Sequence, residues 1–289
     1  GGGAALGMAH VGVIRVLERE NIPIDIVIGS SMGALIGSLW AVGKTADELE
    51  FIAREFKKKA GLLKLFDPPL FPVSGLLRGH KIGRWLRGKL GDKKFSDTSI
   101  PFRAVAYDLL LREELVLDRG DLVEAVQKSI AIPGVIKPVL ENGKMIIDGG
   151  VLNPLPTNVL VDMGIKKIIA VNVLQSPAHV AQGHQMDLRR LELESKISFS
   201  KEPLRFILFR LGRFFCRIVI PNISDIIVRT LQASEYVIAQ QSAKSANVVI
   251  HPNLTGIHWF ELYKVDELIR LGEEAAIQQL PAIKELIKE

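Results

Sequence analysis

The uncharged stretch from Ile26 to Gly43 restricts the fold more than any other part of the sequence. It is 18 residues long, which just reaches the length of a candidate membrane-spanning helix. However, it contains four glycines and three serines, and it starts with the β-branched run Ile26-Val27-Ile28. A buried strand, a tight turn and an apolar helix account for this composition better than a single membrane span does. No transmembrane segment is therefore predicted.

Outside this stretch, short apolar runs alternate with amphipathic ones. With 48% hydrophobic and 24% charged residues, the 289-residue chain can bury a substantial core and is not typical of a disordered or fibrous protein. Strands are expected at 24–28, 102–107, 114–117, 145–148, 167–173 and 247–250, and helices at 34–42, 46–59, 121–130, 223–241 and 265–288. This alternation predicts an α/β fold with a largely parallel sheet covered by helices on both faces.

The basic residues are concentrated locally. Residues 54–94 hold 12 Lys and Arg against 3 Asp and Glu, although the net charge of the whole chain is only +5. We expect a core over residues 1–175, with residues 54–99 as a basic, lid-like excursion. A helical C-terminal part over residues 176–289 is expected to pack on this core, and it contains a basic amphipathic segment at 196–220.

The turn within the uncharged stretch fits the pattern G-x-S-x-G. Gly29-Ser30-Ser31-Met32-Gly33 lies between an expected strand and an expected helix, which is the context that this nucleophile motif requires. A sharp turn of this kind forces strained dihedrals at Ser31, and side chains at positions 29 and 33 would collide with neighbouring backbone. Ser31 is therefore the candidate nucleophile. The alternative is a Gly/Ser turn that only packs tightly.

A serine nucleophile needs a proton acceptor, which is usually a histidine oriented by a carboxylate. Among the six histidines, only His251 and His258 remain as triad candidates. Asp148 offers a different base, because it ends an expected strand and is followed by Gly149 and Gly150, which let its carboxylate approach another turn closely. An ordinary aspartate has a pKa of about 3.9, so either burial raises the pKa of Asp148 or its carboxylate acts mainly by orienting Ser31.

A glycine-rich segment, residues 1–7, opens the first expected helix. Backbone N–H groups of such a loop can point into one concavity and bind a phosphate or an acyl oxyanion. A nucleotide-binding fingerprint fits less well, because no strand precedes the glycines and Asp25 precedes its strand instead of ending one. The segment is therefore a candidate oxyanion hole.

Together, the three ordered motifs resemble those of the patatin-like phospholipase family, and especially of its small bacterial members. The resemblance rests on GGGAALGMAHVGVI from Gly1, GSSMGALIGSLWA from Gly29, SIAIPGVIKPV from Ser129 and DGGVLNPLP from Asp148, and it spans residue 1 to about residue 173. It implies a three-layer α/β/α patatin-like fold with a mostly parallel central sheet and a helical C-terminal extension.

The resemblance also implies a serine acyl hydrolase of the phospholipase A or lysophospholipase type, which cleaves carboxylic esters of lipids through an acyl-enzyme. It makes Ser31 the nucleophile and Asp148 the base of a dyad without histidine. The N–H groups of Gly2, Gly3 and Ala4 would form the oxyanion hole, and the supporting glycines of the two motifs are Gly29, Gly33, Gly149 and Gly150.

Two positions depart from the family's pattern. The family usually has Arg or Lys where this chain has Leu6, and commonly a third glycine where it has Ala4. The oxyanion loop is therefore expected to differ from the family's in charge and shape. The family's first strand is expected just before Gly1, so a segment upstream of this sequence is also expected.

A phospholipid or lysophospholipid is the expected substrate, and no cofactor or metal is expected. The single Cys216 is too little for a thiolate metal site or an internal disulfide. The basic stretches interleaved with aromatic residues predict peripheral contact with an anionic membrane, and no nucleic-acid motif accompanies them. The expected location is cytoplasmic, on the inner face of the membrane. Two alternatives remain open. One is an α/β-hydrolase-type esterase with a histidine base, and the other is a catalytically silent lipid-binding regulatory module.

Overall fold

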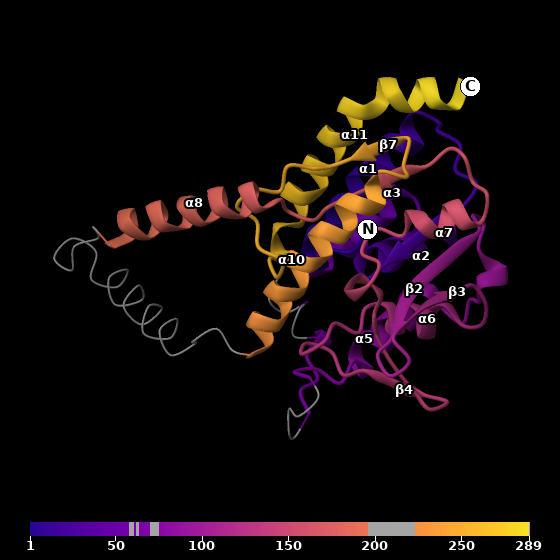
Figure 1. The fold of residues 1–289 in the computed structure, drawn as a ribbon, viewed down its shortest axis with the longest axis horizontal. Coiled ribbons are helices and arrows are strands. Elements are labelled where there is room, and N and C mark those ends of the chain that lie inside the picture. The colour runs from indigo at the N-terminus through magenta and orange to yellow at the C-terminus, as the bar shows by residue number, and fades with distance from the viewer. Residues whose placement is uncertain (58–60, 62–63, 70–74, 196–222, 289) are drawn as a thin grey trace.

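The computed structural model describes residues 1–57, 61, 64–69, 75–195 and 223–288 (Figure 1). The strands are β1 (Val27–Ser30), β2 (Phe102–Asp108), β3 (Glu113–Leu117), β4 (Val139–Glu141), β5 (Lys144–Asp148), β6 (Ile169–Val171) and β7 (Val248–Ile250). The α-helices are α1 (Ala9–Arg19), α2 (Met32–Ala41), α3 (Ala46–Ala53), α5 (His80–Leu90), α6 (Leu122–Ser129), α7 (Thr157–Asp162), α8 (Pro177–Ser195), α10 (Ile223–Ala243) and α11 (Val265–Lys288). The 3-10 helices are η1 (Ala4–Met8), η2 (Arg54–Lys57), η3 (Phe95–Asp97), η4 (Gly149–Val151) and η5 (Leu262–Lys264).

Local sequence signals account for several of these boundaries. Helix α3 begins with a capping box, in which the Thr45 hydroxyl accepts a hydrogen bond from the Glu48 N–H and the Glu48 carboxylate accepts one from the Thr45 N–H. Asp121 is the N-cap residue of helix α6, and its carboxylate accepts a 3.0 Å hydrogen bond from the N–H of Glu124. Asn142 and Gly143 form the tight turn between β4 and β5, and both have a positive φ.

Strands β1 and β5 meet end to end along one edge of β2. Strand β1 runs parallel to β2, with Ser30 opposite Val105, and β5 runs antiparallel to it, with Asp148 opposite Ala106. Strand β3 pairs with the other edge of β2, and β4 continues the sheet beyond β5. Because β1 and β5 run in opposite directions, their carboxyl ends face each other at adjacent residues of β2.

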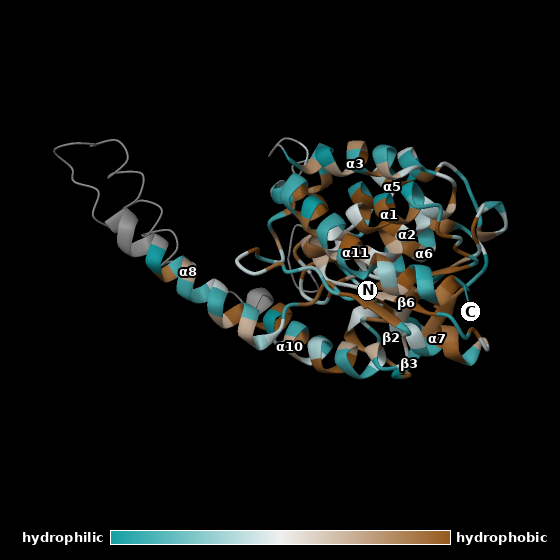
Figure 2. Ribbon diagram, turned by 90° about the horizontal axis from the view of Figure 1, so that it is seen from above, coloured by the Kyte–Doolittle hydropathy of each residue, from teal (hydrophilic) through white to brown (hydrophobic). Residues whose placement is uncertain are grey.

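Helices cover the strands on both sides. In Figure 2, helices α1, α2, α3, α5 and α6 lie together on one side of the strands. The second sheet, β6 paired with β7, has both faces packed against helices. Ile250 of β7 packs with apolar side chains of α1 and α11, whereas Ala170 of β6 packs with Ala239 of α10. The result is a helix–sheet–helix arrangement.

The α/β class expected from the sequence is confirmed, while the strand pairing is more mixed than the alternation of strands and helices indicates. Strand pairs β1–β2 and β6–β7 are parallel, and β2–β3, β2–β5 and β4–β5 are antiparallel. Short turns join β2 to β3 and β4 to β5, and such a turn permits only antiparallel pairing.

Residues 54–99 and 176–289, which are expected to lie outside the core, differ in how closely their helices pack on it. Within residues 54–99, helix α5 packs against α6 and buries Leu86 and Leu90 completely or nearly so, at 0% and 2% exposure. Helix α11 packs along α1, whereas α8 projects from the body of the molecule (Figure 1). The basic amphipathic segment expected at 196–220 lies outside the described residues. None of the described helices is long and apolar enough to cross a bilayer.

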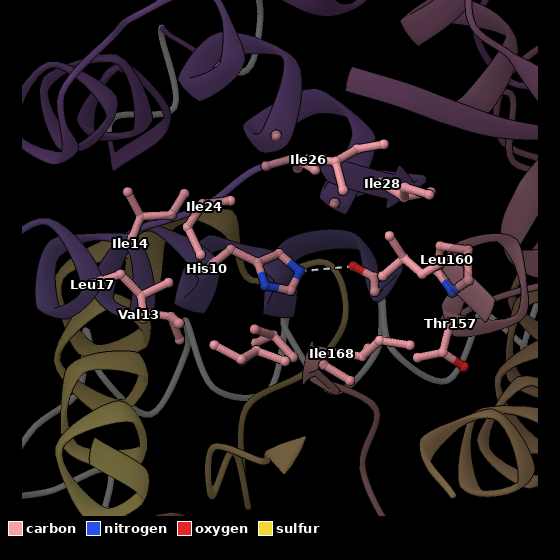
Figure 3. A pocket seen from close by; sticks show the side chains of 18 of the residues that line it. His10, Val13, Ile14, Leu17, Ile24, Ile26, Ile28, Thr157, Leu160 and Ile168 are labelled. Atoms are coloured by element: carbon pink, nitrogen blue, oxygen red, sulfur yellow. Dashed lines mark hydrogen bonds between the residues drawn. The ribbon is translucent and has the colours of Figure 1, made fainter. Parts of the chain in front are cut away.

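An apolar cavity of about 400 Å³ separates the two sheets. Figure 3 shows Ile26 and Ile28 on one side of it and Ile168 on the other, with His10 between them. Strand β1 pairs with β2 on its other edge and β6 pairs with β7, so within the described residues the cavity lies between two strand edges without a strand partner. Gly1 lies at its wall, where a Cβ atom would be 3.0 Å from the carbonyl oxygen of Val171.

Candidate active site

Ser31 occupies the turn between β1 and α2 in a strained conformation. Its φ and ψ are 54° and −123°, which costs a non-glycine residue about 1–3 kcal/mol. A Cβ atom at Gly29 would lie 2.4 Å from the carbonyl oxygen of Gly33, and one at Gly33 would lie 2.6 Å from the carbonyl oxygen of Gly1. The turn therefore requires glycine at both positions, and it carries the Ser31 side chain at the N-terminus of α2.

Asp148 lies at the carboxyl end of β5 and contacts Ser31 directly. The Ser31 hydroxyl donates a 2.6 Å hydrogen bond to Oδ2 of Asp148, and the N–H of Gly150 donates a 2.7 Å hydrogen bond to Oδ1. A Cβ atom at Gly149 would lie 2.3 Å from the carbonyl oxygen of Val105, so glycine lets the chain pass close to β2 there. Both members of the pair are buried, with exposed fractions of 6% for Ser31 and 4% for Asp148.

Burial sets the protonation of Asp148. Desolvation raises the pKa of Asp148 to about 7, and the hydrogen bonds from Ser31 and Gly150 oppose this rise because they stabilise the carboxylate. Among the described residues, no Lys or Arg lines the cavity beside the pair. A carboxylate whose pKa is close to neutral is a better proton acceptor than an ordinary aspartate with a pKa of about 3.9.

The three expected oxyanion donors are not equivalent. The N–H of Gly2 donates a 2.7 Å hydrogen bond to the carbonyl oxygen of Pro154, so this amide is already occupied. Within the described part of the chain, the N–H groups of Gly3 and Ala4 donate no hydrogen bond, and both residues line the same cavity as Ser31. The geometry thus leaves Gly3 and Ala4 as available donors and does not leave Gly2.

Two buried residues that hold the site were not singled out from the sequence. The Ser129 hydroxyl accepts a 3.0 Å hydrogen bond from the N–H of Ser31 and donates a 2.6 Å hydrogen bond to the carbonyl oxygen of Val105. His10 lies 2.7 Å from the carbonyl oxygen of Gly1 through Nε2, and burial lowers the pKa of His10 to about 3, so its neutral ring donates this bond. Ser129 belongs to a segment that carries the family resemblance, whereas a lone histidine within a helix gives no pattern.

Helix α10 covers the Ser31–Asp148 pair. The cavity beside the pair has a volume of only about 30 Å³, and α10 contributes four of its lining residues, Val228, Leu231, Gln232 and Glu235. Trp259 also lines it, and the indole N–H of Trp259 is buried without a hydrogen-bond partner among the described residues. No described residue of the range 54–99, which is expected to form a lid, lines this cavity.

His251 and His258, the two triad candidates from the sequence, contact groups other than Ser31 and Asp148. His251 lies 2.8 Å from the carbonyl oxygen of Asn172 through Nδ1, and His258 lies 3.0 Å from Oδ2 of Asp187 through Nε2. Neither residue lines the cavity beside Ser31. In the described part of the chain, no group of three or more His, Cys, Asp or Glu side chains is arranged to hold a metal ion.

Comparison with known proteins finds patatin-like phospholipases and NTE family proteins. A sequence model of the family described as patatin-like phospholipase matches residues 1–161. An uncharacterized NTE family protein of Mycobacterium tuberculosis is 38% identical over 182 residues, which cover 63% of this chain and 50% of that protein. Human patatin-like phospholipase domain-containing protein 6 is 32% identical over 178 residues, which cover 60% of this chain and 13% of that protein.

These matches differ in extent. The chain spans about half or less of the length of the curated relatives it matches. Among solved structures, VipD from Legionella pneumophila is 13% identical with a TM-score of 0.46, over 97% of this chain and 65% of that one. The family model covers more than half of the chain, and it includes Ser31, Asp148 and the glycine-rich loop. The resemblance drawn from the motifs is thereby confirmed, and the chain belongs to the patatin-like phospholipase family.

Proposed function

We propose that this chain is a lipid acyl hydrolase of the phospholipase A or lysophospholipase type, with Ser31 as nucleophile and Asp148 as general base. The observation that carries the proposal is the 2.6 Å hydrogen bond from the Ser31 hydroxyl to a buried carboxylate whose pKa lies at about 7. In the acylation step, the Ser31 proton passes to Oδ2 of Asp148 while Oγ attacks the carbonyl carbon of the lipid ester.

The negative charge that develops on the carbonyl oxygen needs preorganised donors. The unoccupied N–H groups of Gly3 and Ala4 lie in the same cavity, and the N-terminus of α2 favours negative charge. When the ester bond breaks, protonated Asp148 returns its proton to the leaving alcohol and the acyl group stays on Ser31. A water molecule then gives a proton to Asp148 while its oxygen attacks the acyl carbon. The bond between that carbon and Oγ breaks, Asp148 returns the proton to Oγ, and the fatty acid is released.

The histidine-based alternative has less support, because His251 and His258 bind other groups. A catalytically silent module remains the competing proposal, and the burial of Ser31 beneath α10 favours it. A fluorophosphonate probe separates the two, since it reacts with an activated serine without needing a lipid. Labelling that disappears in Ser31→Ala and Asp148→Asn supports the hydrolase, whereas no labelling of the intact chain at Ser31 supports the silent module.

The experiment that tests the proposed function directly is release of fatty acid from a panel of phospholipids and lysophospholipids. Ser31→Ala should reduce the rate to the blank. Asp148→Asn should reduce it by about 10²- to 10⁴-fold, which is the usual contribution of a general base. Equal rates for wild type and both variants would contradict the assignment of the dyad.

We also propose that the chain meets its substrate at an anionic lipid surface. Exposed basic side chains gather on and around α5; they are Arg78, Lys81, Arg84, Lys93 and Lys94. Each basic residue near an anionic membrane contributes about 1 kcal/mol to binding. Co-sedimentation with anionic vesicles, but not neutral ones, is the expected result. The double variant K81E/R84E should bind anionic vesicles more weakly than wild type. If wild type binds neither anionic nor neutral vesicles, the proposal of an anionic docking surface is rejected.

A further inference from the structure

Helix α10 brings a second carboxyl group to the dyad. Leu231, Gln232 and Glu235 follow Val228 by three, four and seven positions, which places all four residues on one face of a helix. This face closes the cavity that holds Ser31 and Asp148. Three of its side chains are uncharged, so Glu235 is the charged residue that α10 presents to the site.

The position of Gly150 shows how close the two carboxyl groups are. A Cβ atom at Gly150 would lie 3.0 Å from Oδ1 of Asp148 and 3.2 Å from Oε1 of Glu235. The two oxygens are therefore no more than about 6 Å apart, within the range over which one carboxylate disfavours ionisation of another. Glycine at position 150 also keeps the space between them free of a side chain.

We propose that Glu235 is a positioning residue of the dyad, which must be protonated for Ser31 and Asp148 to react and whose ionisation turns the site off. The inference rests on the proposed function of the dyad. Asp148 must be ionised to accept the Ser31 proton, so the active form carries one negative charge on the two carboxyl groups. Ionisation of Glu235 places a second negative charge beside the position where the oxyanion develops.

The titration order agrees with this assignment. Burial, and then the charge of Asp148, raise the pKa of Glu235 to about 8, whereas burial raises the pKa of Asp148 to about 7. The hydrogen bonds from Ser31 and Gly150 favour the ionised form of Asp148, so the first proton is lost there, and its charge holds the proton on Glu235. The reactive state, with Asp148 ionised and Glu235 protonated, is most populated between these two values.

No other charged group is available to reverse this order within the described part of the cavity. The remaining lining residues are neutral: Gly2, Gly3, Ala4 and Ser31 from the loop and the turn, Ile132 and Pro133 after α6, Gly150 and Val151 of η4, and Trp259. On α10 itself, Arg229 is exposed and does not line the cavity. The two carboxyl groups thus titrate as a coupled pair in a neutral surrounding.

The test is the rate of fluorophosphonate labelling at Ser31 between pH 5.5 and pH 9.5, measured on the full chain and corrected for spontaneous hydrolysis of the probe. Wild type should give a bell-shaped profile, with a fall of about tenfold by pH 9, one unit above the pKa of Glu235. Glu235→Gln should keep the acidic limb and lose the alkaline fall, so that it labels about tenfold faster than wild type at pH 9. Glu235→Asp should retain the alkaline fall, since it keeps a carboxyl group there.

Each outcome has a separate meaning. Labelling of Ser31 with an alkaline limb that persists in Glu235→Gln would overturn the role of Glu235 and leave the proposed function standing. No labelling at any pH would overturn the proposed function itself. A wild-type profile that stays flat to pH 9.5 would also overturn the inference, even if Glu235→Gln failed to fold. Glu274→Gln, an exposed carboxyl-to-amide change on α11, is the matched control and should follow wild type.

Discussion

The Ser31 hydroxyl and the Asp148 carboxylate are 117 residues apart in the chain, and they lie 2.6 Å apart because β1 and β5 end against adjacent residues of β2. The nucleophile turn follows the last residue of β1, and Asp148 is itself the last residue of β5. Neither strand carries both groups, so the pair forms only when both strands are in register with β2.

Asp148→Asn should change how stability depends on pH. The carboxyl group has a pKa of about 7 in the folded chain, whereas its ordinary pKa is 3.8. Through this group the folded state binds more protons between about pH 4 and pH 7, so the contribution of Asp148 to the free energy of unfolding falls as pH rises through this window and is constant above it. The raised pKa corresponds to up to about 4 kcal/mol.

Urea unfolding at pH 4.5 and pH 8 measures this effect. Wild type should lose stability between the two values, and Asp148→Asn should lose less, because its amide does not ionise. Equal losses in the two proteins would show that Asp148 does not titrate as a buried carboxyl group.

Ser129→Ala should weaken both stability and turnover. The change leaves the N–H of Ser31 and the carbonyl oxygen of Val105 without their partner in a buried place, at a cost of about 1–3 kcal/mol. The Ser31 turn also loses a support, so kcat should fall together with the midpoint of unfolding. Ser38→Ala is the matched control, because Ser38 is equally buried but bonds only within α2. It should lose stability while keeping the activity, and a Ser129→Ala enzyme with wild-type kcat would contradict the prediction.

Val228→Ala should open the site. The Val228 side chain is 4% exposed and lines the closed cavity on Ser31, so its truncation loosens the contact of α10 over the dyad. Fluorophosphonate labelling should become several-fold faster at pH 7.5. Val237→Ala truncates the same residue type on the same helix, but Val237 is 60% exposed and should have no effect. An equal rate for both variants would mean that α10 does not limit access.

Filling the cavity between β1 and β6 should stabilise the fold. An apolar, β-prone peptide of five residues, fused before Gly1, would enter a space of about 400 Å³ and offer hydrogen-bonding groups to both strand edges. Burial of its side chains is worth about 1.5–3 kcal/mol for each large one. The melting temperature should rise, and a Gly/Ser fusion of the same length should not raise it.

The sequence predicted those parts of the molecule that depend on local patterning. The strand, glycine turn and helix around Ser31 are visible as a run without charges, and the start of α6 at Asp121 and the turn at residues 142–143 follow from capping and turn preferences. The two small-residue motifs predict the pairing of Ser31 with Asp148, because glycines let two backbone turns approach each other closely.

The rest depends on contacts that have no local signal. Glu235 lies in a long amphipathic helix whose pattern marks its buried face but not what that face covers. The Gly2 N–H donates to the carbonyl oxygen of Pro154, and the Ser31 N–H donates to the Ser129 hydroxyl. In both hydrogen bonds the two partners lie far apart in the chain. The mixed pairing of the sheet depends likewise on which edge of β2 each strand joins, which alternating strands and helices do not specify.

Strands β1 and β5 end opposite Val105 and Ala106, so strand β2, which carries no reactive group, determines the distance between the nucleophile and the base. Inserting or deleting one residue at this point of β2 would shift the two strand ends relative to each other by about 3.4 Å, more than the length of the bond between hydroxyl and carboxylate. Homologues could thus lose hydrolysis through an indel in a strand without reactive groups, while every residue of the G-x-S-x-G and D-G-G motifs remained intact. Inspection of the motifs alone would then classify an inactive protein as an active hydrolase.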